Sequence, residues 1–170
     1  MKIIFEGPDG CGKTNIAEAL SKRIGIPVYK SGKEADIFHD KNAQYLTLKW
    51  ANYEMIKILE TTNASIIFDR FFPSEYVYSK VFNRNSDHQL VLEYDEWWHK
   101  IGGKIIFLDK QTIDVDDELV PRSKYNEIRE RYIKYMGLTK CKFLYLDTSD
   151  YNLKEQVNTI CDFLFLGENK

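Results

Sequence analysis

FEGPDGCGKT, residues 5–14, is the stretch that decides the fold of this chain. It reads Gly7, four further residues, and then Gly12-Lys13-Thr14, which is the complete G-x-x-x-x-G-K-[ST] pattern of a phosphate-binding loop. Glycines let the backbone fold around an anion with its N–H groups turned inward. The pattern predicts that Lys13 reaches the β- and γ-phosphates of a nucleotide and that Thr14 offers its hydroxyl to Mg²⁺.

The segments on either side of this stretch have the character that such a loop requires. Residues 2–6, KIIFE, are a short apolar run typical of a strand. Residues 15–24 follow with apolar side chains at helical spacing, so a helix would bring the positive end of its dipole to the phosphates. A strand, a glycine-rich loop and a helix in this order predict a nucleotide-binding site.

Strand-like and helix-like segments alternate along the rest of the chain. The strand candidates are residues 26–30, 65–68, 104–108 and 142–146, and the helix candidates are residues 42–61, 73–82, 88–101, 124–136 and 153–166. Because the strands are continuous apolar runs, this order indicates a parallel sheet covered by helices on both faces. We therefore predict one α/β domain, residues 1–170, with the three-layer P-loop NTPase fold.

The composition argues against several other classes of protein. The chain has 170 residues, 44% of them hydrophobic, and a formal net charge of −2, which gives no bulk electrostatic reason to expect nucleic-acid or membrane binding. No apolar run approaches the roughly 18 residues of a membrane helix, and no signal peptide precedes the first strand. The three cysteines are scattered without metal-ligand spacing, which favours a reducing cytoplasm.

The residues of the loop resemble the phosphate loop of thymidylate kinases, a family of deoxynucleotide kinases with acidic residues at the positions of Glu6 and Asp9. The resemblance implies that Asp9 bonds the sugar 3′-hydroxyl of the nucleotide acceptor. The other interpretation of Asp9 is a residue that only stabilises the loop turn. The resemblance also implies that the whole loop binds the nucleotide donor, through Gly7, Gly10, Cys11, Gly12, Lys13 and Thr14.

A second stretch, IIFDRFFPSEYVYS, resembles the thymidylate kinase segment in which Asp-Arg ends a strand. Asp69, Arg70, Ser74 and Tyr78 fall on the family's positions. The resemblance implies that Asp69 acts beside Mg²⁺ and the reacting phosphates and that Arg70 binds the acceptor's phosphate, roles that suit a carboxylate and a guanidinium. A structural ion pair for Asp69-Arg70 and plain packing for Tyr78 are the alternatives.

The expected acceptor pocket departs from the family. WANYE, residues 50–54, resembles the segment from which an arginine grips the acceptor, but Tyr53 stands at or near that arginine's place. The Arg-Glu-Pro motif expected after the second strand is also missing. Trp50, Tyr53 and Phe72 are candidates to stack on the acceptor base, although a tryptophan such as Trp50 is more often a core residue.

The resemblance implies a lid at about residues 111–124 and a donor-base loop near Asp147 and Thr148. Gly10 stands where one family subtype has a catalytic arginine, so the lid should supply that arginine instead. Arg122 is our choice. Of Arg129 and Arg131, we expect at least one to lie on a solvated helix face.

These features together predict an ATP- and Mg²⁺-dependent kinase of a deoxynucleoside monophosphate, most simply dTMP. The proposed catalytic residues are Asp9, Lys13, Asp69, Arg70 and Arg122, with Thr14 and Asp69 on the metal. A deoxynucleoside, or a hydroxyl on a modified pyrimidine either free or within DNA, stays open as acceptor. A nucleotide-binding regulatory module without transfer activity is the alternative of another class. A homodimer through helices is expected if Trp97 or Trp98 is exposed.

Overall fold

The computed structural model describes residues 1–30, 47–111, 121–150 and 152–165. The strands are β1 (Lys2–Glu6), β2 (Val28–Lys30), β3 (Ile66–Asp69), β4 (Lys104–Asp109) and β5 (Lys142–Asp147). The α-helices are α1 (Lys13–Ile24), α4 (Tyr53–Thr61), α5 (Phe72–Val81), α6 (His88–Lys100), α7 (Tyr125–Met136) and α8 (Leu153–Phe165). A π-helix, η1 (Thr47–Asn52), precedes α4, and a 3₁₀ turn, η2 (Arg122–Lys124), precedes α7.

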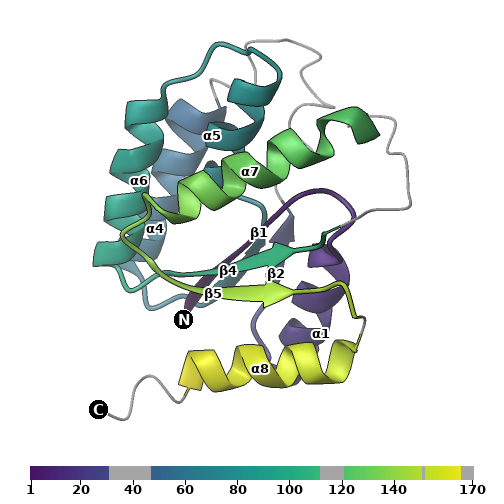
Figure 1. The fold of residues 1–170 in the computed structure, drawn as a ribbon. Helices are drawn as coiled ribbons and strands as arrows, with labels where there is room; N and C mark the ends of the chain where they lie inside the picture. Colours follow the sequence, from purple (N-terminus) through teal and green to yellow (C-terminus); the bar gives the residue numbers. More distant parts are fainter. Residues whose placement is uncertain (31–46, 112–120, 151, 166–170) are drawn as a thin grey trace.

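The five strands form one parallel sheet in the order β2-β3-β1-β4-β5. Helices α4 to α7 cover one face of the sheet, and α1 and α8 cover the other (Figure 1). The predicted parallel sheet with helices on both faces is therefore confirmed. In such a sheet the loops after the carboxyl ends of the strands meet at one edge, which is where ligands bind.

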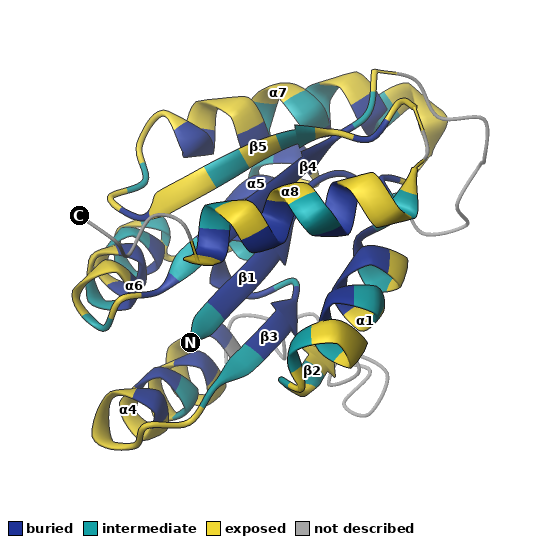
Figure 2. Ribbon diagram, turned by 90° about the horizontal axis from the view of Figure 1, so that it is seen from below, coloured by how far each residue is buried: buried dark blue, intermediate teal, exposed yellow. Residues whose placement is uncertain are grey.

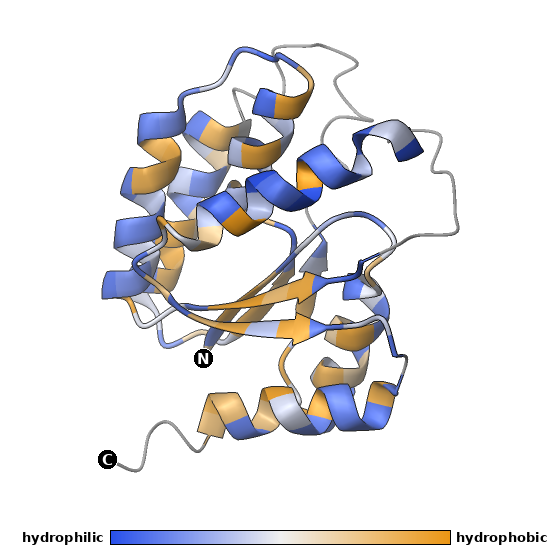
Figure 3. Ribbon diagram, in the orientation of Figure 1, coloured by the Kyte–Doolittle hydropathy of each residue, from blue (hydrophilic) through white to orange (hydrophobic). Residues whose placement is uncertain are grey.

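Alternating side chains of the strands supply two separate apolar cores. Along β1, Ile3 and Phe5 belong to the core under α1 and α8, while Ile4 belongs to the core under the other four helices. The central strands are buried over most of their length (Figure 2), and apolar residues concentrate there (Figure 3). In the part of the chain that is described, no helix is both long and apolar enough to cross a bilayer.

Two elements differ from the expectation. The described part of the helix predicted at 42–61 begins with a π turn, which accommodates one more residue per turn and directs Leu48 and Asn52 inward with Ile56. The continuous apolar run of β5 would suit a strand covered on both faces, but β5 lies at the edge of the sheet, and Phe143 and Tyr145 are exposed there.

Gly7 is the point where the phosphate loop leaves β1 and passes directly over β4. Its φ is +145°, and a Cβ atom at this position would lie 2.1 Å from the carbonyl oxygen of Leu108. We expect Gly7→Ala to lower the free energy of unfolding by about 3 kcal/mol, because backbone strain and a steric clash add together. Chemical denaturation of the purified variant measures this loss.

Gly25→Ala is the matched control for this experiment. Gly25 also has a positive φ, +72°, but nothing lies within 4 Å of its Cβ position. The control variant has the strain of the left-handed backbone alone, so its free energy of unfolding should fall by only about 1 kcal/mol. Equal losses in the two variants would contradict the close approach of Gly7 to β4.

Candidate functional site

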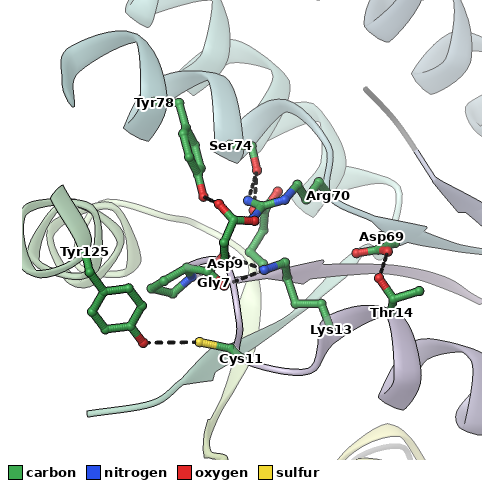
Figure 4. Close-up of polar contacts among 12 residues, drawn as sticks. Gly7, Asp9, Cys11, Lys13, Thr14, Asp69, Arg70, Ser74, Tyr78 and Tyr125 are labelled. Carbon is green, nitrogen blue, oxygen red and sulfur yellow. Dashed lines mark hydrogen bonds and ion pairs between the residues drawn. The ribbon is translucent and has the colours of Figure 1, made fainter. Parts of the chain in front are cut away.

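The phosphate loop wraps around the side chain of its own lysine. The Lys13 Nζ donates hydrogen bonds to the carbonyl oxygens of Gly7, at 2.9 Å, and Pro8, at 2.5 Å (Figure 4). Gly12, with φ +80°, is the N-cap residue of α1 and has no side chain to occupy the space where an anion would sit. Loop N–H groups, the start of α1 and the buried ammonium group of Lys13 thus form a cradle suited to phosphate.

The ammonium group of Lys13 lies in an unfavourable environment. Burial and, to a smaller extent, the positive charge of Arg70 lower the pKa of Lys13 to about 8, against the opposing effect of Asp9. A phosphate group would restore favourable interactions for the charged lysine. The arrangement is therefore one that an anion would stabilise.

Thr14 and Asp69 come together beside this cradle. The Thr14 hydroxyl donates a hydrogen bond of 2.6 Å to Oδ2 of Asp69 at the end of β3, and Lys30 Nζ lies 4.0 Å from the same oxygen. Within the described residues there is no cluster of three side chains that would hold a metal by themselves. A hydroxyl and a carboxylate fit Mg²⁺, which keeps several waters and takes further oxygens from nucleotide phosphates.

Asp9, Arg70 and Tyr78 meet on the other side of Lys13. Arg70 Nη2 forms an ion pair with Oδ1 of Asp9, and the Tyr78 hydroxyl donates a hydrogen bond of 2.6 Å to Oδ2 (Figure 4). Burial by itself would raise the pKa of Asp9, but the charges of Arg70 and Lys13 outweigh it and hold this pKa below its usual value. The structure therefore brings three predicted acceptor-site residues into one group.

A buried polar cluster lies behind Arg70. The Glu6 carboxylate is fully buried and accepts hydrogen bonds from the Phe71 N–H and from the hydroxyls of Ser74 and Tyr132. Tyr132, on α7, was not among the predicted site residues, because nothing in its local sequence separates it from the other tyrosines. The acid at the end of the first strand was visible in the sequence, but only Asp9 was given a role.

Arg129 and Arg131, the two arginines of α7, have different surroundings. The Nε and Nη2 atoms of Arg129 each lie 2.6 Å from an oxygen of the buried Asp109 carboxylate, which also accepts a hydrogen bond from Tyr145. Arg129 thus ties α7 to the end of β4 and is not on a solvated face. Arg131 has the expected surface role, since its Nη2 lies 3.9 Å from Glu127 one turn away.

Two further contacts fix the surroundings of the phosphate loop. The Cys11 Sγ lies 3.6 Å from the hydroxyl of Tyr125, which donates to the carbonyl oxygen of Lys110. Burial raises the pKa of the Cys11 thiol, so it is held as a neutral, small side chain. Thr148 donates from its N–H and its hydroxyl to the carbonyl oxygen of Asp109, which places the predicted donor-base loop beside β4.

Trp50 and Tyr53 lie in a different place from the other predicted acceptor residues. They are 59% and 43% exposed, and with Lys49 and three residues of the α6 region they line a pocket of about 290 Å³. The other three residues are Asp87, Leu90 and Tyr94. The loop and the Asp69-Arg70 turn do not line this pocket. Trp50 is not a core residue, whereas Trp98 is fully buried and Trp97 half-buried.

Arg122 begins η2 and is exposed. No ion pair or side-chain hydrogen bond of Arg122 is found within the described residues. Most of the predicted lid, residues 112–120, and residues 31–46, where the missing Arg-Glu-Pro motif was sought, lie outside the described part of the chain.

The chain is similar in sequence and structure to a protein from a bacterial prophage, although no protein-family model matches it. The SPbeta prophage-derived uncharacterized protein YorR of Bacillus subtilis (strain 168) is 27% identical over 177 residues, covering 98% of each chain. The crystal structure of YorR from Bacillus subtilis, in complex with phosphorylated GDP, superimposes with a TM-score of 0.74 at 23% identity and covers 100% of this chain and 99% of that one.

Two kinases have similar structures. Thymidylate kinase from Ehrlichia chaffeensis has a TM-score of 0.65 at 17% identity, and deoxyadenosine kinase from M. mycoides has 0.63 at 20% identity. Each match covers 96% of this chain and 98% of the other. The chain thus has the P-loop fold of nucleotide kinases, and its resemblance to thymidylate and deoxynucleotide kinases is confirmed at the level of the fold.

Proposed function

We propose that the protein transfers the γ-phosphoryl group of ATP to a deoxynucleoside monophosphate, most simply dTMP, with Mg²⁺. The observation that carries the proposal is that two groups of residues flank Lys13. Thr14 and Asp69 lie on one side, and Asp9 and Arg70 lie on the other. The first group suits the metal and phosphates of a donor, and the second suits a sugar hydroxyl and an oxyanion.

On the donor side, Lys13 would neutralise the β- and γ-phosphates, and Thr14 with Asp69 would hold Mg²⁺ directly or through water. The metal would neutralise charge that develops on the phosphate oxygens. The backbone N–H groups of the loop, with Gly7, Gly10, Cys11 and Gly12, would bind the donor phosphates. Asp147 and Thr148 would border the donor base.

On the acceptor side, Asp9 would accept a hydrogen bond from the sugar, and Arg70 would bind the acceptor's phosphate. Ser74 and Tyr78 would complete this side of the site. Phosphoryl transfer depends mainly on placing reactants and charges, so these residues would act by orientation and electrostatics rather than by covalent chemistry. Trp50 and Tyr53 would take part only if the acceptor base extended to their pocket.

An acceptor without a phosphate is the second candidate, and two observations favour it. Arg70 already uses Nη2 for Asp9 and Nη1 for two hydroxyls, so few of its donors remain for an incoming dianion. Tyr53 also replaces the family's acceptor arginine. A deoxynucleoside, or a hydroxyl on a modified pyrimidine, would need fewer cations.

ADP release from ATP and Mg²⁺ over a panel of acceptors tests the proposal. The panel contains dTMP, dUMP, hydroxymethyl-dUMP, dCMP, dGMP, GMP, thymidine, deoxycytidine, deoxyadenosine and pyrimidine-modified DNA. Turnover of a monophosphate alone supports the first candidate, and turnover of an uncharged acceptor alone supports the second. ATP binding without turnover of any member would favour a nucleotide-binding module instead.

The low pKa of Lys13 makes a prediction about ATP binding. The free site loses the Lys13 proton as the pH rises through about 8, whereas the phosphates of ATP would stabilise the charged form. Binding above this pH should therefore take up a proton, and the affinity should fall as the pH rises further. Calorimetric titration in buffers of different ionisation enthalpy measures both effects. Lys13→Ala should abolish the proton uptake, and a pH-independent affinity in the unmodified protein would contradict the prediction.

A further inference from the structure

We propose that Glu6 is a positioning residue for the acceptor: it sets the place and hydrogen-bond direction of Arg70 through Ser74 and Tyr132. The inference rests on the proposed function and deepens it, because it concerns the residue expected to bind the acceptor. Glu6 itself lies too deep to touch a substrate, since it is fully buried.

The first step of the argument is the direction of the hydrogen bonds. The Ser74 and Tyr132 hydroxyls lie 2.7 and 2.9 Å from Oε2 of Glu6, and a carboxylate can only accept. Both hydroxyls therefore direct their protons at Glu6. Their lone pairs are then free to accept from Arg70 Nη1, at 3.2 Å from Ser74 and 2.9 Å from Tyr132.

The second step concerns the backbone. Arg70 has a positive φ of 70°, a conformation that a residue with a side chain rarely adopts. The next residue, Phe71, donates its N–H to Oε1 of Glu6 at 2.9 Å, and the Arg70 N–H donates to the carbonyl oxygen of Phe5. Strand β1 thus holds the backbone of the turn on both sides of the Arg70 peptide unit. The same carboxylate fixes the backbone and the side-chain partners of Arg70.

The third step is electrostatic. Burial raises the pKa of Glu6, while the charge of Arg70 and the three hydrogen bonds oppose this effect. Burial also raises the pKa of Tyr132, so its hydroxyl keeps its proton and stays a donor to Glu6. An amide in place of the carboxylate would keep the volume but present an N–H group where the hydroxyl protons now point. Glu6→Gln therefore tests the direction of the hydrogen bonds separately from the packing of the side chain.

The experiment compares Glu6→Gln with Asp95→Asn. Asp95 is also buried and accepts hydrogen bonds from Tyr135, Thr139 and Lys140, but it lies outside the site. With dTMP as acceptor, we expect Glu6→Gln to raise KM for dTMP about tenfold and to leave the Kd for ATP within twofold. Asp95→Asn should change neither, although both variants should melt at a lower temperature.

A double-mutant cycle separates positioning from a structural role. In an Arg70→Ala background, Glu6→Gln should change the Kd for dTMP by less than twofold, because the residue it acts through is gone. Equal effects in both backgrounds, or a lower melting temperature with unchanged KM, would overturn the proposal.

The proposal has a readout that does not need turnover. The ¹⁵N signal of Arg70 Nη1, assigned from its loss in Arg70→Lys, should shift in Glu6→Gln and stay in place in Asp95→Asn. This holds for the protein without substrate. If no acceptor in the panel is phosphorylated, the proposed function fails while the shift still tests Glu6. An unchanged Nη1 signal in Glu6→Gln would overturn the positioning role whichever acceptor is used.

Discussion

Lys13→Ala is expected to lower kcat for phosphoryl transfer by at least about 10³-fold while the protein stays folded. Lys13 is the cation at the centre of the loop, between the Thr14–Asp69 pair and the Asp9–Arg70 pair. An alanine would leave the developing charge on the transferred phosphoryl group without this partner. A coupled assay of ADP release under saturating ATP and acceptor measures the loss.

The same substitution should have little effect on stability. Among the described residues, Lys13 donates to two loop carbonyls, and its lowered pKa indicates that the folded protein disfavours the charged form. The melting temperature should therefore stay close to that of the unmodified protein. Lys22→Ala, on the exposed face of α1, is the control and should keep full activity. Retained activity in Lys13→Ala would remove the argument from the phosphate loop.

The fold could be predicted because its signals are local and repeated. Each strand was a short apolar run, and Pro73 marked the first turn of α5. The exposure of Phe143 and Tyr145 on β5 could not be predicted in this way, since KFLYL is as apolar as a buried strand and only the strand order of the sheet places it at the edge. The exposure of Trp50 could not be predicted either, because it depends on an irregular turn of the helix. A π turn changes the phase of the helix, which an α-helical pattern does not contain.

The residues of the candidate site also differ in whether the sequence could predict them. Residues on contiguous motifs could be identified from the sequence: Lys13 and Thr14 from the spacing of the phosphate-loop pattern, and Asp69 and Arg70 from the resemblance to thymidylate kinases. Residues that meet across the fold could not be identified: Tyr132 lies 126 positions from Glu6, and Arg129 lies 20 positions from Asp109. Tyrosine and arginine are common on surface helices, so α7 gave no sign that two of its side chains turn toward the strand ends. The expected lid also contains an acidic run, DVDDE at residues 114–118, which lies outside the described residues.

Arg122→Ala is expected to lower kcat by about 10³-fold, with a much smaller effect on KM for the acceptor, if Arg122 supplies the transition-state cation. Arg122 is separated from residues 112–120 by Pro121 alone, and it makes no ion pair or side-chain hydrogen bond with another described residue. Three positions later, Tyr125 contacts Cys11 of the phosphate loop at 3.6 Å. The chain just after Arg122 is thus anchored beside the phosphate loop, where the proposed donor phosphates would lie.

Arg129 is the competing cation, and comparing the two variants decides between them. Arg129 is held by the buried Asp109 carboxylate, so Arg129→Ala should act mainly by lowering the melting temperature. Arg131→Ala, which removes only a long ion pair on the surface of α7, is the control and should keep kcat within twofold. A 10³-fold loss of kcat in Arg129→Ala with an intact fold would transfer the role to Arg129. A change confined to KM in Arg122→Ala would mean that Arg122 binds phosphate only in the ground state.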